Sequence, residues 1–129
     1  MNRLTKKEKK MNSMFTKEKT IRGFKLFTFK DDYGEKCTLQ ESSSWIPHIW
    51  LGIHTPTASI GWKDAQKLGL DLPKRYPETG ESGWCDYPIP KEVLLSSRMH
   101  LNQQQAYELA QELLYFAKIG NLRGDNNEL

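Results

Sequence analysis

Two histidines flank a tryptophan in HIWLGIH, residues 48–54, and imidazole is a common metal ligand and proton carrier. His48 and His54 are six residues apart, so on a regular strand they share a face but lie roughly 20 Å apart, at about 3.3 Å per residue. Two ligands of one zinc ion, each about 2 Å from the metal, cannot be that far apart. The sequence has no CxxC or HxxxH pair. We therefore predict no metal site here.

The other residues that could carry out catalysis also lack the sequence context of a known catalytic site. Cys37 falls in an alternating segment typical of a core strand, and Cys85 lies in a loop with no histidine near it in sequence. The serines of residues 42–44 lack the GxSxG context, and Asp31-Asp32 suits a tight turn. Glycine-rich phosphate-binding motifs are absent. We predict a non-enzymatic protein with no catalytic residues and no cofactor.

Four segments have the alternating pattern of strands. They are FKLFTFK (24–30), KCTLQES (36–42), HIWLGIH (48–54) and VLLSSRMHL (93–101), and the turn DDYGE joins the first two into a hairpin. In the third, Ile49, Leu51 and Ile53 point to one face, while His48, Trp50, Gly52 and His54 point to the other. In the fourth, the inward residues are Val93, Leu95, Met99 and Leu101.

Two helices complete the prediction. TASIGWKDAQKLGL (57–70) predicts a loop leading into a short helix that stops near Gly69. Asn102 and Gln105 form a capping box for a long helix that ends at Gly120. Its apolar stripe consists of Ala106, Ala110, Leu113, Leu114 and Ala117. The predicted fold class is α+β: an antiparallel sheet of about four strands, with the C-terminal helix packed on one face and a short helix in a connection.

Residues 71–90 form a long segment without periodicity. The segment contains four prolines and two glycines, yet it also carries Tyr76, Trp84 and Tyr87. Long irregular segments in small domains tend to be functional or disordered, and disordered linkers are poor in aromatic residues. We therefore predict that Trp84 and Tyr87 belong to a recognition loop.

The outward sides of the predicted strands form a candidate binding face. Its residues are Thr38, Gln40, His48, Trp50, His54, Arg98 and His100. Trp and Arg are the residues most enriched at binding hot spots, which favours protein or small-ligand recognition. Aromatic residues on an open sheet can also stack bases, but no basic residue accompanies Trp50 on its own strand. The alternative is that Trp50 is buried and that the histidines are ordinary surface residues.

The net charge of +3 is unevenly distributed. Residues 1–20 hold seven of the 19 Lys and Arg residues and two of the 16 acidic residues, so the rest of the chain is net negative by two charges. We predict a basic, disordered tail over 1–20, a single domain over 21–122 and a frayed end over 123–129. No apolar run approaches the roughly 18 residues of a membrane span, and no secretory signal is recognisable, so we expect a cytoplasmic protein without membrane contact.

Three stretches resemble a family of short proteins encoded by bacteriophages and prophages. They are DDYGEKCTLQESS, IWLGI and SSRMHLNQQQAYELAQELLYFAKIGNL, and the likeness covers residues 24–122. The resemblance implies an accessory protein of a mobile element, located in the cytoplasm of a bacterial host cell. It assigns no activity and no site residues.

The sequence therefore predicts stoichiometric binding to a host or defence protein, as an anti-CRISPR protein does, through the open sheet face and residues 71–90. One alternative is a nucleic-acid-binding protein whose tail, residues 1–20, contacts phosphates. Another is a sponge for a nucleotide second messenger, held between protomers by Trp and Arg. The oligomeric state is left open.

Overall fold

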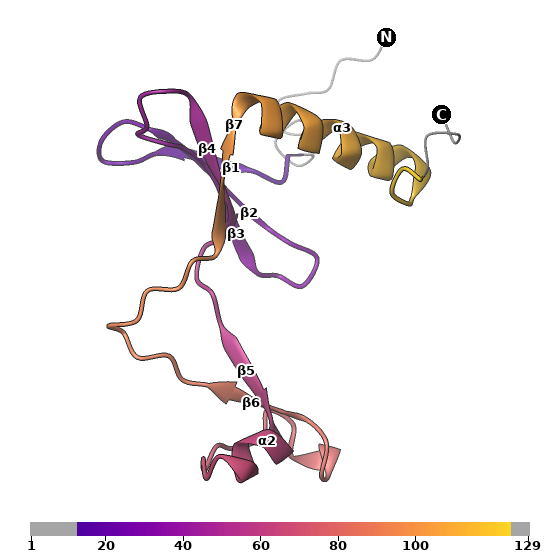
Figure 1. Ribbon diagram of the computed structural model, residues 1–129. Coiled ribbons are helices and arrows are strands. Elements are labelled where there is room, and N and C mark those ends of the chain that lie inside the picture. Colours follow the sequence, from indigo (N-terminus) through magenta and orange to yellow (C-terminus); the bar gives the residue numbers. More distant parts are fainter. Residues whose placement is uncertain (1–12, 125–129) are drawn as a thin grey trace. The chain divides into compact units, whose positions relative to one another are not determined.

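A computed structural model describes residues 13–124, and the chain divides into two units (Figure 1). Residues Thr55–Ser97 form one unit, and the described residues on either side of them form the other. Residues 55–97 contain a small sheet and a helix of their own. The single domain over 21–122 stays a prediction.

The first unit is built on a five-stranded antiparallel sheet in the order β1-β2-β3-β4-β7. Its elements are β1 (Thr16–Lys19), β2 (Lys25–Lys30), β3 (Lys36–Glu41), β4 (His48–Ile53), β7 (Arg98–Asn102) and the helix α3 (Gln103–Ile119). The second unit holds a short helix, α2 (Trp62–Lys67). The α+β fold class is thereby confirmed, with five strands in place of about four.

The turn between β2 and β3 follows the predicted chemistry. One carboxylate oxygen of Asp31 accepts hydrogen bonds from the backbone N–H groups of Tyr33 and Glu35, each at 2.9 Å. Gly34 has a φ of 85°, in the left-handed region where glycine is favoured. These contacts fix the register in which Phe29 stands opposite Cys37 and Phe27 opposite Leu39.

The sheet begins earlier in the chain than predicted. The segment TKEK forms the edge strand β1, with all four residues exposed, inside the stretch that we predicted to be a disordered tail. It pairs with β2 through its backbone, so its side chains carry no apolar alternation that a sequence pattern could reveal. Phe15 anchors it, with ring centroids 5.5 Å from Phe29 and 6.0 Å from Phe27. Residues 1–12 of the predicted tail, and 125–129 of the predicted frayed end, lie outside the described residues.

Strand β7 is shorter than the predicted strand over 93–101. Its register with β4 runs from Asn102 opposite His48 to Arg98 opposite Gly52. Strand β4 ends one residue later, at Ile53, so residues 93–96 lie beyond the end of β4. Val93, Leu94 and Leu95, two of which we predicted to face the core, are exposed.

Helix α3 starts and stops as predicted. The side chain of Asn102 accepts from the backbone N–H of Gln105 at 2.7 Å, and the side chain of Gln105 accepts from the backbone N–H of Asn102 at 3.1 Å. Gly120 ends the helix with a φ of 90°, and its N–H donates to the carbonyl of Phe116. The apolar stripe differs from the prediction, because none of the described α3 residues is buried.

The second unit consists of a two-stranded sheet with helices beside it. Its elements are β5 (Ala58–Gly61), α2, a 3₁₀ turn η1 (Pro77–Thr79) and β6 (Trp84–Tyr87), with β5 and β6 antiparallel. Cys85 of β6 and Ala65 of α2 are fully buried and form its core. The sequence missed both strands, since four residues each are too few to show an alternating pattern.

Candidate functional site

The register of the five-stranded sheet separates its side chains into two faces. On one, Gln40, Trp50 and His100 stand opposite one another across β3, β4 and β7, with Arg98 one row away. We call this the recognition face. On the other, Phe27, Leu39, Leu51 and Met99 form a matching row across β2, β3, β4 and β7, and we call it the apolar face.

Three aromatic rings of the recognition face stack on one another. The ring centroids of Trp50 and His100 are 4.1 Å apart with an interplanar angle of 30°. Those of His48 and His100 are 4.5 Å apart at 14°. His100 is exposed, while Trp50 and His48 are half-buried. The stack therefore holds planar groups in fixed orientations at the protein surface.

Arg98 joins this stack from β7. Its guanidinium carbon lies 5.2 Å from the centroid of the Trp50 ring, within the range of a cation–π contact. Its Nη1 donates to the side-chain oxygen of Gln40 at 3.0 Å. Gly52, opposite Arg98 in the register, has no side chain, so the arginine can cross β4. An arginine fixed in this way retains N–H donors that can bind a carboxylate.

Two serines orient the histidines. Nε2 of His100 is 2.8 Å from the hydroxyl of Ser42. Nδ1 of His48 is 3.0 Å from the hydroxyl of Ser44 and 2.8 Å from the carbonyl oxygen of Ile46. A Ser–His catalytic pair also needs a group that orients the base, commonly a carboxylate. Here the neighbours of His100 are the rings of Trp50 and His48, so the contacts favour positioning over nucleophilic catalysis.

Two features beside the stack were not predicted. Trp45, in the loop between β3 and β4, is fully exposed, and the loop carries the Ser44 and Ile46 groups that hold His48. A hollow of about 660 Å³ lies next to Trp50 on the same face of the sheet, toward β2. Its lining includes Ile21, Arg22, Phe24, Leu26, Gln40 and Trp50. The signal for Trp45 was its place directly after three serines and before Ile-Pro, which favours a loop. The hollow depends on the chain turn before β2, which has no sequence motif.

The predicted aromatic, histidine and arginine binding residues were His48, Trp50, His54, Arg98 and His100 on the sheet and Trp84 and Tyr87 in the 71–90 segment. The structure brings four of these seven together: His48, Trp50, Arg98 and His100. His54 follows the end of β4, and its backbone N–H donates to the carbonyl of Lys36, while its ring has no part in the stack. Trp84 and Tyr87 are exposed at the two ends of β6 and belong to the second unit. Trp50 is half-buried, between the exposed and buried alternatives that the sequence allowed.

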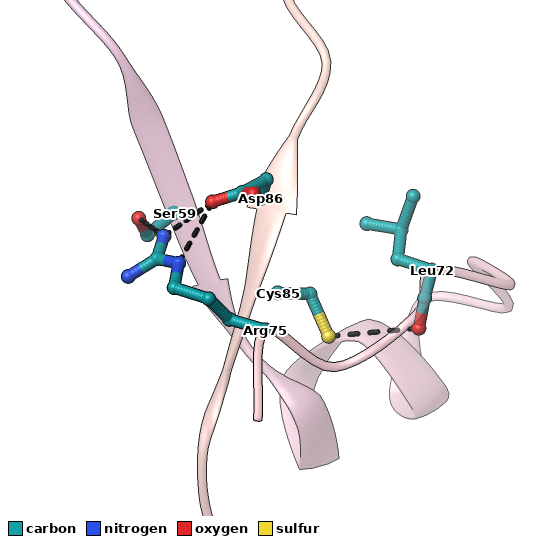
Figure 2. A network of polar contacts seen from close by, with 5 residues as sticks. All are labelled: Ser59, Leu72, Arg75, Cys85 and Asp86. Carbon is teal, nitrogen blue, oxygen red and sulfur yellow. Dashed lines mark hydrogen bonds and ion pairs between the residues drawn. The ribbon is translucent and has the colours of Figure 1, made fainter. Parts of the chain in front are cut away.

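The second unit has a polar network of its own (Figure 2). Arg75 donates from Nε to a carboxylate oxygen of Asp86 at 2.9 Å and from Nη2 to the hydroxyl of Ser59 at 2.6 Å. Its backbone N–H bonds the carbonyl of Trp84 at 2.8 Å, so the start of the 71–90 segment runs along β6. Arg75, Ser59, Asp86 and Tyr87 line a hollow of about 510 Å³. Part of the predicted irregular loop is therefore ordered by an ion pair across β5 and β6.

The cysteines are buried thiols. Cys37 lies on the apolar face, and burial raises the pKa of its thiol, with the nearby carboxylates of Asp31 and Glu35 raising it further. The Sγ of Cys85 is 3.6 Å from the carbonyl oxygen of Leu72 (Figure 2). Among residues 13–124, no three His, Cys, Asp or Glu side chains gather in a way that could hold a metal ion.

No family model matches the chain, and no curated protein and no solved structure matches it either. The described helices include none that is both long enough and apolar enough to cross a membrane.

Proposed function

We propose that the protein acts by binding another protein through the recognition face, without catalysing a reaction. The observation that carries the proposal is the surface stack of His48, His100 and Trp50 with Arg98 beside it. Trp and Arg dominate the energetics of many protein interfaces. Because the rings already stack and Gln40 already holds Arg98, little side-chain freedom is lost when a partner binds.

The chemistry of the stack indicates what the partner presents. The Arg98 guanidinium offers N–H donors in a fork that matches a carboxylate, and the Trp50 ring offers an apolar surface beside it. The hollow next to Trp50 adds Phe24 and Leu26, with Arg22 over the Phe24 ring at 5.3 Å. A partner surface with a Glu or Asp beside an aliphatic or aromatic side chain complements this arrangement.

The proposed biological setting rests on the resemblance to phage and prophage accessory proteins. Such proteins commonly act stoichiometrically, and a host or defence protein is the partner that this setting suggests. We therefore propose an anti-defence role in the cytoplasm of a bacterial host, with the recognition face as the contact surface.

The first test is capture of a partner from host lysate by the tagged protein, followed by the same capture with Trp50→Ala combined with Arg98→Ala. We expect the wild type to retain a partner that the double variant loses, while both proteins give the same circular dichroism spectrum, because Trp50 is only half-buried and Arg98 is exposed. A matched control is Tyr33→Ala, which removes a fully solvent-exposed aromatic ring at the β2–β3 turn. If the double variant captures the same partner as the wild type, the proposal fails.

Arg98→Lys separates charge from geometry. Lysine keeps the positive charge but lacks the planar fork that stacks on Trp50 and binds Gln40. We expect this variant to lose most of the binding that Arg98→Ala loses. If the partner is nucleic acid instead, affinity will fall steeply with salt, and removal of residues 1–12 will weaken binding more than Arg98→Lys does.

A further inference from the structure

The described residues leave two apolar surfaces of the first unit partly exposed. On the apolar face, Phe27, Leu39 and Leu51 are half-buried and Met99 is 51% exposed. On α3, two leucines of the stripe and two aromatic side chains beside it are more than half exposed: Leu113, Leu114, Tyr107 and Phe116. Apolar patches of this extent on a folded protein mark interaction surfaces.

The connection between β7 and α3 keeps these two surfaces apart within one chain. Strand β7 ends at Asn102 and α3 begins at Gln103, with no residue between them (Figure 1). The capping box of Asn102 and Gln105 fixes the direction in which the helix leaves the strand. A helix that folds back across its own sheet needs a connection of several residues. Helix α3 therefore cannot cover its own apolar face while this cap is intact.

We propose that a second copy of the chain covers both surfaces, with α3 of each copy lying across the apolar face of the other. Such an exchange is reciprocal, so one two-fold axis satisfies both helices and both sheet faces. The recognition face lies on the opposite side of the sheet, so both copies keep it available for a partner.

The dimensions of the two surfaces agree. Helix α3 has 17 residues, which is about 25 Å at 1.5 Å per residue. Five strands spaced about 4.8 Å apart span roughly 19 Å between the outer strand axes. One helix of this length therefore crosses the sheet from edge to edge.

The area is sufficient for a stable dimer. Fully burying a Phe or Tyr side chain removes roughly 150–250 Å² from solvent. Tyr107 and Phe116 are 60% and 51% exposed, so each α3 can bury about half of that area at each ring, in addition to two half-exposed leucines. The facing sheet side chains lose a comparable area. Two such contacts bring the total to the lower part of the roughly 1,200–2,000 Å² range of specific interfaces.

The direct test is the solution mass of the full chain by light scattering or sedimentation across a dilution series. We expect twice the 15.0 kDa mass of one chain at the high end of the series. A protein that stays at the mass of one chain at every concentration overturns the proposal, and this result needs no variant.

Two variants identify the contact. Leu113→Glu changes the helix stripe and Met99→Glu changes the apolar face, and both positions are exposed enough for the fold to tolerate the change. We expect each to weaken dimerisation at least tenfold, whereas Gln104→Glu, on the opposite side of α3, leaves it unchanged. Circular dichroism spectra that match the wild type show that each variant is folded.

Mixing the two variants tests the exchange itself. The mixed dimer retains one intact contact, because the unaltered helix of the Met99→Glu copy meets the unaltered sheet of the Leu113→Glu copy. We expect more dimer in the mixture than in either variant alone. If Met99→Glu keeps the wild-type dimer while Leu113→Glu abolishes it, the contact is helix to helix and the proposal is wrong.

Discussion

At the scale of single residues, the buried side chain of Thr38 gives a prediction about stability. Thr38 is buried on the recognition-face side of β3, and its hydroxyl has no hydrogen-bond partner among the described residues. A buried polar group without a partner costs about 1–3 kcal/mol. We expect Thr38→Val to raise the free energy of unfolding by about 1 kcal/mol in urea titrations. A lower stability would mean that the hydroxyl has a partner in solution.

Cys37 gives a prediction about pH. Because burial and the carboxylates of Asp31 and Glu35 raise the pKa of its thiol in the folded protein, the thiolate is favoured in the unfolded chain. The protonated Cys37 thiol therefore contributes fully to the stability of the folded protein below the pKa of about 8.5 that it has in the unfolded chain. This contribution is lost as the pH rises through the raised pKa of the thiol in the folded protein. We expect the urea midpoint to fall more steeply above that pH in the wild type than in Cys37→Ala. Parallel pH profiles for the two proteins would contradict this assignment.

At the scale of elements, the cap of α3 stabilises the helix and also sets the direction in which the helix leaves β7. Asn102→Ala removes the acceptor for the Gln105 N–H, and loss of an N-cap of this kind costs about 1 kcal/mol. We expect that loss of stability in denaturant titrations, with Asn102→Asp as a control that retains the acceptor. If the variant also loses its dimeric mass at equal protein concentration, the cap directs the helix as well as stabilising it.

The elements also show what the sequence can predict. Local chemistry identified the β2–β3 turn, the β4 alternation and both ends of α3, because Asp31, Asn102, Gln105 and Gly120 act on their immediate neighbours. Strands β1, β5 and β6 escaped prediction, because their pairing is made by backbone groups and their side chains lack alternation. The sequence also placed the end of β7 directly before the Asn102 cap, but periodicity does not give the direction in which α3 leaves β7, and the exposure of the α3 stripe depends on that direction.

The same distinction applies to the candidate site. Alternation placed His48, Trp50, Arg98 and His100 on one face, and the strand order made them neighbours. The reach of Arg98 across Gly52 to Gln40, and the serine contacts of both histidines, depend on register between strands far apart in the sequence. Trp84 and Tyr87 belong to the second unit, since the 71–90 segment pairs with β5 rather than forming one long loop.

At the scale of the whole molecule, we propose separate roles for the two faces of the five-stranded sheet. In this account the apolar face and α3 bind a second copy of the chain, and the recognition face binds the partner protein. The two proposals can be tested separately. Leu113→Glu and Met99→Glu alter α3 and the apolar face, whereas Trp50→Ala and Arg98→Ala alter the recognition face. A monomeric variant that still binds the partner would show that dimerisation is not required for recognition.

The central claim is that the Trp50–Arg98 stack binds a protein, and titration calorimetry with the captured and purified partner tests it most directly. We expect the Trp50→Ala, Arg98→Ala variant to bind about 1,000-fold more weakly than the wild type, since two hot-spot residues that each contribute about 2 kcal/mol together contribute about 4 kcal/mol. The Tyr33→Ala control should bind as the wild type does. Equal affinities for the wild type and the double variant would contradict the account.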